Sequence, residues 1–298
     1  IRSEDRRFWE AIDEVMEIGR QAEVPVRVSH LKLAMTSSHG QTDRLLDTLD
    51  AAREEGIEVT ADIYPYTYWQ STLTVMFPDR NFEDPEAARF AVEELSSPEN
   101  MLIPDFDPDP SLAGKTLAEI ATLRGTDPAT TLIDLIREAE AMRAEKRAAG
   151  EDEDIESIIA VSMTEADIEK LIAWPHINFC TDGDLDGSHP RGYGAFPRVL
   201  GRYVRERQVL TLEQAIHRMT GLAAAHHGIS NRGRIEPGAC ADLVLFDPAT
   251  VADRSTTDEP HARAAGIECV WVNGHLISQD GREGRQRYGR VVRLEPSS

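Results

Sequence analysis

The sequence predicts an α/β fold of parallel strand–helix units followed by a β-rich tail. Residues 5–22 have helical spacing of apolar residues and run into the apolar segment VPVRVSH, and the helix-like TDRLLDTLDAAREEG separates that segment from IEVTADIYPY. Continuous apolar runs of this kind are typical of parallel strands that are buried on both faces. Two such strands with a helix and short connections between them indicate a right-handed parallel unit.

Length and charge narrow the range of partners. The chain has 298 residues, of which 41% are hydrophobic, enough for one large domain or for a large and a small one. The 53 acidic residues outnumber the 32 Lys and Arg residues, which gives a net charge of -21. Such a surface repels phosphate backbones, so we expect a small-molecule partner and no nucleic acid. No run approaches the roughly 18 apolar residues of a membrane span, so we expect no membrane association.

The cysteines suggest a compartment. Cys180, Cys240 and Cys269 form no CxxC pair and no disulfide framework. Three isolated thiols fit a reducing environment, so we expect a cytoplasmic location.

Residues 72–157 interrupt the strand–helix rhythm. They carry the proline-rich segments SSPEN and IPDFDPDP and two helical stretches, TLAEIATLRG and DPATTLIDLIREAEAMRAEKRAAG. The connection is too long for an ordinary loop inside a compact domain. Insertions of this size often form lids or rims over active sites, and a purely structural excursion is the alternative.

After the insertion we expect the alternation to resume. SIIAVSM is a strand-like run, MTEADIEKLIAW a helix capped near Thr164, and HINFC a third buried strand. Two helices follow, residues 196–207 and TLEQAIHRMTGLAAAHHG. The remainder reads as short strands, with an Asn-Gly hairpin turn at Asn273 and Gly274.

Three strand ends carry polar side chains. In a parallel βα barrel the C-terminal strand ends face the active site. Here these ends are His30 with Lys32, the segment 62–66, and Asp182. Zinc binds histidine nitrogen, and an aspartate can take a proton from water and return it to a leaving amine, so the set suits a metal-assisted hydrolase. A histidine inside the core and a TDG turn are the structural alternatives.

The third strand end is the richest in charged groups. TDGDLDGSHPRGYGAFPRVL contains Asp182, Asp184, Asp186, His189 and Arg191. A calcium loop is disfavoured, because the spacing and the closing Glu of an EF-hand are missing. The glycines on either side of the tyrosine predict a tight turn before the next helix. The arginine can hold a carboxylate through two hydrogen bonds, or form an ion pair with a neighbouring acid.

Together these motifs resemble the D-aminoacylase family, the N-acyl-D-amino-acid deacylases of the amidohydrolase superfamily. The resemblance runs from Ile1 to about Arg290 and rests on SHLK, TADIYPYT, MTEADIEKLI, TDG, HPRGYGAFPRVLGRYVRE and GRIEPGACADLVLFDPATVADR. The HPRxYGxFPRVLxRYVRE pattern is quite specific to this family. The ADLVLFD element is shared widely across the superfamily.

The resemblance implies the C-terminal part of a metal-dependent TIM (β/α)8 barrel with a helical lid insertion and part of a small β-sandwich. Barrel units around strands six and seven would occupy residues 1–71 and the lid-like insertion 72–157. The last barrel strand and its helices would occupy 158–234, and the C-terminal part of the sandwich 235–298. The family's first-strand HxH pair has no counterpart here, and Ile1 to Glu4 match the part of a fifth-strand motif that follows its histidine. We therefore expect a truncated fragment that is inactive alone.

The resemblance also assigns roles to residues. His30 would bind zinc, of which the intact enzyme would hold one or two ions. Asp182 would act as general base and then general acid, and Arg191 would hold the substrate's carboxylate. Three further residues match positions in or near the substrate site: Lys32, Tyr66 and Ser71. Cys180 lies within an apolar run and is expected to be a buried core cysteine.

The expected reaction is zinc-dependent hydrolysis of the amide bond of N-acyl-D-amino acids, which yields a free D-amino acid and a carboxylate. One alternative is a cyclic-amide hydrolase of the dihydroorotase or hydantoinase type, because Arg191 suits any substrate carboxylate. A second alternative is a non-catalytic half-barrel binding protein. The sequence leaves the oligomeric state and the substrate side chain open.

Overall fold

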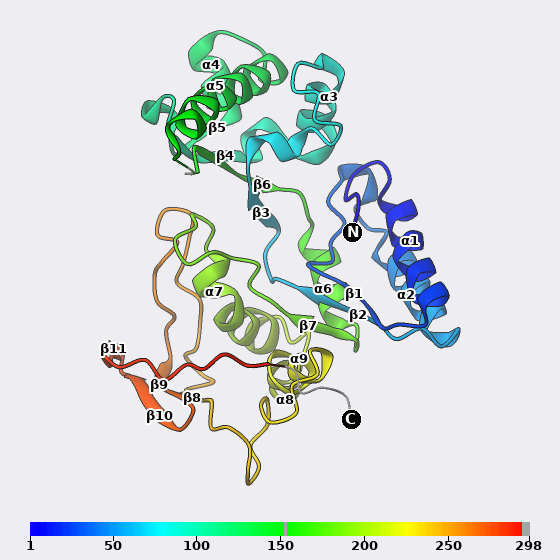
Figure 1. Cartoon of the computed structure of the whole chain (residues 1–298), viewed down its shortest axis with the longest axis vertical. Helices are drawn as coiled ribbons and strands as arrows, with labels where there is room; N and C mark the ends of the chain where they lie inside the picture. The colour runs from blue at the N-terminus through cyan, green and yellow to red at the C-terminus, as the bar shows by residue number, and fades with distance from the viewer. Residues whose placement is uncertain (152–153, 294–298) are drawn as a thin grey trace. The chain divides into compact units, whose positions relative to one another are not determined.

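The computed structural model describes residues 1–151 and 154–293. Residues 152–153 of the predicted insertion and 294–298 of the predicted tail lie outside this range. The chain divides into two compact units (Figure 1). Unit 1 combines Ile1–Glu23, Lys32–Ala51 and Tyr66–Ile168, and unit 2 combines Val24–Leu31, Ala52–Pro65 and Glu169–Ser298.

Unit 2 contains the predicted parallel sheet. Strands β1 (Val26–Val28), β2 (Val59–Ile63) and β7 (Ile177–Phe179) pair in the order β1-β2-β7, and both pairings are parallel. All of β2 is buried, as its apolar sequence predicted. The register places Arg27 beside Thr60 and Asp62 beside Asn178, so these four side chains share one face. The intervening apolar residues face the other side.

The helices that precede β1 and β2 in the chain also agree with the sequence pattern. Helix α1 (Phe8–Ala22) buries Phe8, Ile12 and Met16, while helix α2 (Thr42–Glu54) ends just before Gly56. Four short 3-10 helices occur in the described part of the chain: η1 (Thr36–Ser38), η2 (Leu73–Met76), η4 (Pro98–Asn100) and η5 (Pro110–Leu112).

The insertion in unit 1 has an antiparallel sheet of its own. Its strands are β3 (Tyr68–Ser71), β4 (Met101–Phe106), β5 (Lys115–Thr116) and β6 (Glu156–Val161), in the order β3-β6-β4-β5. SIIAVSM was expected to resume the parallel alternation, and this expectation is wrong. That segment forms β6, which pairs antiparallel with β3 and β4. The outgoing strand β3 and the returning strand β6 hydrogen-bond to each other and so close the insertion.

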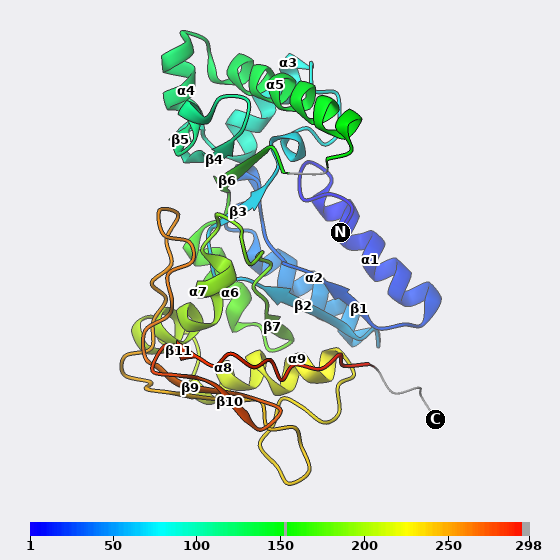
Figure 2. The ribbon, with the colours of Figure 1, turned by 60° about the vertical axis from the view of Figure 1, so that its left-hand side comes forward.

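Helices cover this sheet, as Figure 2 shows for α4 and α5. They are α3 (Pro85–Phe90), the π-helix η3 (Ala91–Leu95), α4 (Leu117–Arg124) and α5 (Pro128–Ala149). Helix α4 starts with a capping box formed by Thr116 and Glu119, and Asp127 caps α5. Sheet and helices enclose one apolar core, which includes Phe77, Ile103, Phe106, Leu132, Ile136 and Ile158.

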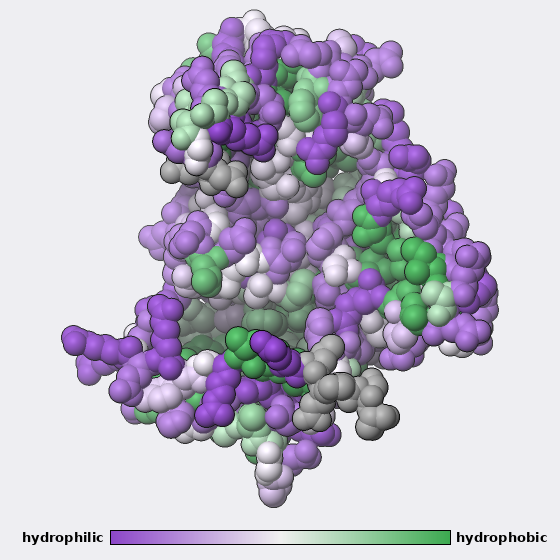
Figure 3. Space-filling model, viewed as in Figure 1, coloured by the Kyte–Doolittle hydropathy of each residue, from purple (hydrophilic) through white to green (hydrophobic). Residues whose placement is uncertain are grey.

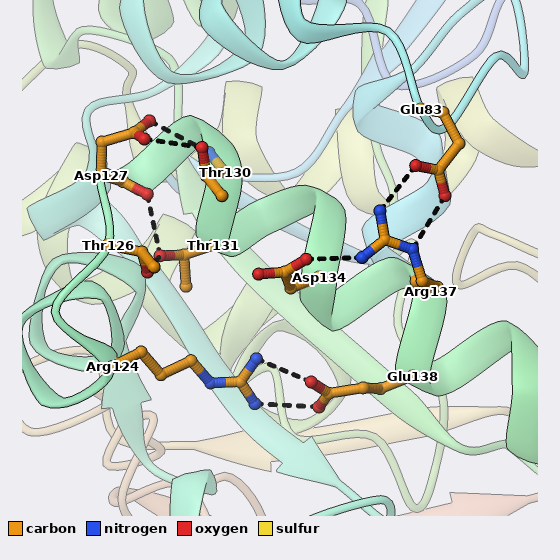
Figure 4. A network of polar contacts seen from close by, with 9 residues as sticks. All are labelled: Glu83, Arg124, Thr126, Asp127, Thr130, Thr131, Asp134, Arg137 and Glu138. Carbon is orange, nitrogen blue, oxygen red and sulfur yellow. Dashed lines mark hydrogen bonds and ion pairs between the residues drawn. The ribbon is translucent and has the colours of Figure 1, made fainter.

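Ion pairs fix α5 to its neighbours (Figure 4). The Arg124 guanidinium donates to both carboxylate oxygens of Glu138 at 2.8 Å. Arg137 donates to Glu83 at 3.0 and 2.6 Å and to Asp134 at 2.6 Å. The Arg137 side chain is 55% exposed, so water screens its ion pairs and they add little to stability. The apolar core therefore supplies most of the insertion's stability.

The helices after the insertion are α6 (Glu165–Ala173), α7 (Arg191–Arg198), the π-helix η6 (Val199–Glu206), α8 (Leu212–Met219) and α9 (Gly221–His226). The helix predicted over residues 196–207 begins earlier, at Arg191. The tight turn predicted around Tyr193 is therefore wrong, because that residue lies in the first turns of α7. The last predicted helix is broken at Thr220, whose backbone is not helical.

The tail forms an antiparallel sheet in unit 2. It contains β8 (Leu243–Phe246), β9 (Ile267–Val272), β10 (His275–Gln279) and β11 (Arg282–Glu283), in the order β11-β10-β9-β8. Asn273 and Gly274 connect β9 to β10 with φ angles of 49° and 81°. Two successive positive φ angles are those of a type I′ turn, which confirms the predicted hairpin.

The surface agrees with the strongly acidic composition. Hydrophilic residues cover most of the face in Figure 3, and a hydrophobic patch lies over α1 and α2. Among residues 1–151 and 154–293, none of the helices combines the length and apolar character needed to cross a bilayer.

Asp167 is the polar centre of unit 1. Its carboxylate accepts hydrogen bonds from Thr42 Oγ1 at 2.5 Å, from Thr164 Oγ1 at 2.6 Å, and from the Gly40 N–H at 3.0 Å. It thereby joins the first turn of α6 to the loop that precedes α2. Burial raises the pKa of Asp167, but these hydrogen bonds outweigh it, and the pKa lies below its usual value.

We predict that Asp167→Asn lowers the free energy of unfolding by about 1–3 kcal/mol at neutral pH, because the amide cannot accept the same set of hydrogen bonds. A folded-state pKa below the unfolded value stabilises above about pH 4, and this stabilisation is lost as the pH falls through the folded-state pKa. The difference between wild type and variant should therefore shrink below about pH 4 in urea unfolding. Asp134→Asn, at an exposed ion pair, is the control and should change stability by less than about 1 kcal/mol. A difference independent of pH would contradict this account.

Candidate functional site

The C-terminal ends of the parallel strands lie along one edge of the unit 2 sheet. His30 follows β1, Tyr64 follows β2 and Asp182 follows β7. Backbone pairing continues past the strands, because the Leu31 N–H donates to the Asp62 carbonyl at 2.8 Å and the Cys180 N–H donates to the Ile63 carbonyl at 3.1 Å. The predicted metal ligand His30 and the predicted general base Asp182 thus follow strands β1 and β7, which both pair with β2.

Both residues have an unusual backbone. His30 has a φ of 41° and Asp182 a φ of 49°. Among the described residues, the other non-glycine positions with positive φ are Glu23, Arg80, Gln208, Asn273 and Asp280. A left-handed non-glycine residue costs of order 1 kcal/mol or more, and such residues concentrate at functional sites. The two predicted site residues at strand ends share this feature.

Asp62 holds the turn that carries His30. Its Oδ1 atom accepts the backbone N–H of His30 at 2.7 Å, and the carboxylate is buried, with 9% exposure. A buried carboxylate needs such donors, since an unpaired charge is expensive to desolvate. Sequence reasoning gave this residue no role. The available signal was a charged residue within the otherwise apolar run ADIY.

Cys180 lies beside the same carboxylate. Burial, the Asp62 carboxylate and the charge of Asp182 raise the pKa of the Cys180 thiol, although Arg191 acts in the opposite direction. Cys180 is only partly buried, so the fully buried core position expected from the sequence is wrong.

The described residues do not complete a metal site. Within residues 1–151 and 154–293, no three His, Cys, Asp or Glu side chains are grouped so that they could hold a metal ion. A catalytic zinc normally needs three protein ligands. His30 is thus a single candidate ligand, and these residues alone do not fit a zinc centre.

Asp182 and Arg191 are brought together. Arg191 Nη1 lies 2.7 Å from Asp182 Oδ2, and the arginine is only 7% exposed. The guanidinium carbon sits 4.6 Å from the centre of the Tyr64 ring. The Arg191 backbone N–H donates to His189 Nδ1 at 2.9 Å, and His189 is itself buried. The cation is therefore fixed by an ion pair, an aromatic face and its own backbone.

Two glycines allow Asp182 to lie this close to Arg191. A Cβ atom on Gly183 would lie 2.6 Å from the backbone nitrogen of Gly192, and one on Gly192 would lie 2.7 Å from the Asp184 carbonyl oxygen. Contacts that short do not occur in stable structures. The TDG segment therefore packs directly on the first turn of α7, which places Asp182 next to Arg191.

The other predicted substrate-binding residues belong to unit 1. Lys32 is buried and donates to both oxygens of Glu4, at 2.7 and 2.9 Å. Tyr66 is buried against the edge of Tyr68, with ring centres 5.4 Å apart. Ser71 ends β3 and pairs with Ile158 of β6.

The sequence did not predict the roles of Glu4 in unit 1 and Tyr64 in unit 2. Glu4, within the Arg-Ser-Glu segment, is the ion-pair partner of Lys32. In YPY the sequence favoured Tyr66, whereas Tyr64 lies under the Arg191 guanidinium. A tyrosine motif alone cannot tell which ring the arginine contacts.

Comparison with known proteins shows what this chain is similar to. Residues 176–277 match the Amidohydrolase family. The N-acyl-D-glutamate deacylase and the D-aminoacylase of Alcaligenes xylosoxydans xylosoxydans are 34% and 33% identical over 100% and 98% of this chain. The crystal structure of N-acyl-D-glutamate deacylase from Bordetella bronchiseptica, complexed with zinc and a phosphonate inhibitor, superposes with a TM-score of 0.77. It is 36% identical and covers 95% of the chain.

Over essentially its whole length, this chain is similar to D-aminoacylase and N-acyl-D-glutamate deacylase. It spans about half the length of these relatives: 54% and 53% of the two Alcaligenes proteins and 54% of the Bordetella chain. This similarity implies a TIM-barrel-type fold. The dihydroorotase of Lactobacillus johnsonii also matches, with 42% identity over only 28% of the chain. Similarity over the full chain therefore favours the D-aminoacylases.

We predict that Gly192→Ala destabilises the protein, although alanine normally favours a helix by about 1 kcal/mol over glycine. The new methyl group would overlap the Asp184 carbonyl, and overpacking of this kind costs about 1–3 kcal/mol. Chemical denaturation measures the difference. Gly289→Ala is the control, because its Cβ meets nothing within 4 Å. Stabilisation by Gly192→Ala would show that the close contact is absent.

Proposed function

We propose that the chain is part of a zinc-dependent N-acyl-D-amino-acid deacylase. The observation that carries this proposal is the buried Arg191 cation, paired with Asp182 at the C-terminal edge of the parallel sheet. Similarity over the whole chain to N-acyl-D-glutamate deacylase and D-aminoacylase supports it. The substrate class is a small N-acyl-D-amino acid, and the products are a D-amino acid and a carboxylate.

Arg191 binds the α-carboxylate of the substrate. A guanidinium has five N–H donors in a fork that matches a carboxylate, and the contact with Tyr64 keeps this fork in one plane. Partial burial strengthens the interaction, because few water molecules compete. Fixing the carboxylate on one side of the reacting amide also favours one configuration at Cα.

Asp182 moves the proton. Its ion pair with Arg191 holds the carboxylate at the strand end. An incoming substrate carboxylate competes for the guanidinium, which frees an Asp182 oxygen to accept a proton from the attacking water. As the amide C–N bond breaks, Asp182 returns that proton to the departing nitrogen, so that a neutral amine leaves.

His30 is the zinc ligand that this chain contributes, and the remaining ligands for one or two ions would come from outside residues 1–298. When bound, zinc would supply Lewis-acid stabilisation of the amide carbonyl and acidify water. Lys32, Tyr66 and Ser71 contact substrate or adjoin its site, and the salt bridge to Glu4 keeps Lys32 in place. The full catalytic site thus needs chain beyond these residues.

The proposal also covers the insertion and the tail sheet. Residues 72–157 form a lid-like insertion, and its separate core and sheet support its behaviour as one body. The tail sheet is part of a small β-sandwich. Its exposed apolar residues, among them Val244 at 54% and Leu276 at 45%, are consistent with a missing second layer.

A substrate panel on a full-length enzyme that contains this chain tests the proposal. N-acyl-D-amino acids should release free D-amino acid, and the L-enantiomers should not. Ring opening of a cyclic amide without release of a D-amino acid would instead establish the dihydroorotase or hydantoinase alternative. Binding of an N-acyl-D-amino acid without turnover of either class would establish the non-catalytic alternative.

In that enzyme, Arg191→Met should lower kcat/KM by roughly 10²-fold or more, since a charge-assisted bidentate contact is lost. Asp182→Asn should lower kcat by roughly 10²–10⁴-fold, because no group remains to move the proton. Arg137→Met, which breaks an exposed Arg–carboxylate contact in the insertion, is the control and should leave both constants unchanged. Full activity of Arg191→Met would remove the carboxylate clamp from the proposal.

We further predict that residues 1–298 alone bind zinc weakly and hydrolyse no N-acyl-D-amino acid, because the described residues supply one candidate ligand of the three required. Metal analysis after dialysis and a ninhydrin assay for free amine measure the two properties. Stoichiometric zinc with turnover would contradict this prediction.

A further inference from the structure

The connection between β8 and β9 is fastened to the helix that carries Arg191. At the C-terminal end of α7, Arg198 Nη1 donates to Asp253 Oδ2 at 3.0 Å. Arg198 Nε donates to the Pro65 carbonyl at 2.8 Å. The Arg198 and Asp253 side chains are only 22% and 17% exposed. One guanidinium therefore joins a segment of the tail to the end of β2.

A second contact reaches the start of the same helix. Ser255 Oγ donates to the Pro190 carbonyl at 3.1 Å, and Ser255 is 6% exposed. Pro190 is the N-cap residue of α7 and directly precedes Arg191. A buried hydroxyl thus fixes the peptide unit from which the Arg191 side chain departs.

The loop before Pro190 is held by the same segment. A ring nitrogen of His261, Nε2, lies 3.1 Å from the Gly187 carbonyl oxygen. The His261 ring also lies against Tyr193 of α7, with ring centres 5.2 Å apart. Residues 253–261, which we call the bracing segment, therefore contact α7 and its preceding loop at several places.

The bracing segment helps to fix the position of the Arg191 guanidinium relative to the Tyr64 ring. Arg191 lies on α7, and its guanidinium packs on Tyr64, 4.6 Å from the ring centre. The residue after Tyr64 is Pro65, whose carbonyl Arg198 binds. Arg198 thus links the helix that carries the cation to the strand end that carries the aromatic ring, and Asp253 fixes the orientation of Arg198.

We infer that Arg198, Asp253 and Ser255 are positioning residues for Arg191. This inference rests on the proposed function in one respect, that Arg191 binds the substrate's carboxylate. None of the three needs to touch the substrate. Their role is to keep the guanidinium in the plane that receives the carboxylate, and a displacement near 1 Å at such a site can cost about 10²-fold in rate.

The structure offers a matched control. Arg205 on η6 donates to the Val251 and Pro248 carbonyls at 2.7 and 3.2 Å, so it binds the same β8–β9 connection. Those contacts lie before the bracing segment and involve neither Pro190 nor Pro65. Loss of Arg205 therefore removes comparable hydrogen bonds without loosening the Arg191 peptide.

The test uses the full-length enzyme and four variants: Arg198→Met, Asp253→Asn, Ser255→Ala and Arg205→Met. For an N-acyl-D-amino acid, the first three should raise KM about tenfold, which corresponds to one hydrogen bond, with kcat changed less than about threefold. For the matching carboxamide substrate, which has no anionic carboxylate, KM should stay the same. Arg205→Met should leave both values near wild type. Because all three variants weaken one linkage, Arg198→Met with Asp253→Asn should be less than additive.

Binding of the N-acyl-D-amino acid, measured by calorimetry, gives a readout besides turnover, and thermal melting shows that each variant folds. If the wild type binds the ligand but releases no D-amino acid, the proposed function fails. The inference still stands in that case if Arg198→Met weakens binding and Arg205→Met does not. Equal losses in Arg198→Met and Arg205→Met, or equal losses for carboxylate and carboxamide ligands, would overturn the inference. Unchanged KM and binding in Ser255→Ala and Asp253→Asn would overturn it as well.

Discussion

Parallel pairing of β1, β2 and β7 is the constraint on which the site depends. Because the strands run in the same direction, their C-terminal ends lie at one edge, and residues 30, 64 and 182 follow strands that end along that edge of the unit 2 sheet. In an antiparallel sheet, the C-terminal ends of neighbouring strands would instead lie at opposite edges. The polar residues at this edge are supported by an apolar face on the other side of the sheet, so these polar groups are separated from the packing that stabilises the sheet.

Several features that are unfavourable for folding free energy are concentrated at that edge. His30 and Asp182 have left-handed backbones, and Asp62 and Arg191 are buried charges. Each cost is offset by a local partner, as when Asp62 accepts the His30 N–H and Arg191 pairs with Asp182. A buried ion pair gains little net stability over apolar packing, but it fixes geometry. The arrangement is therefore better explained by positioning than by stability.

Much of the fold could be predicted from the sequence, and parts of the site could not. Periodicity and caps gave α2, α4, α5, the parallel strands and the Asn273–Gly274 hairpin, because these depend on local chemistry. SIIAVSM was misplaced, since an apolar run does not reveal the direction of its partner strand. The start of α7 was missed because Gly192 and Gly194 weaken the helical pattern, whereas tertiary contact with the TDG segment requires glycine at position 192. Ser255 and Arg198 had no signal at all, because they bind backbone carbonyls distant in sequence.

The pairing of β3 with β6 has an evolutionary consequence. Ser71 and Ile158, where the insertion begins and ends, are paired residues in the β3–β6 ladder, with Cα atoms about 5 Å apart. An excursion that leaves and returns at the same point can change in length or sequence, or be exchanged for another, without moving the parallel strands. The sequence of this module can therefore vary without any change at the strand ends that carry His30, Asp62 and Asp182.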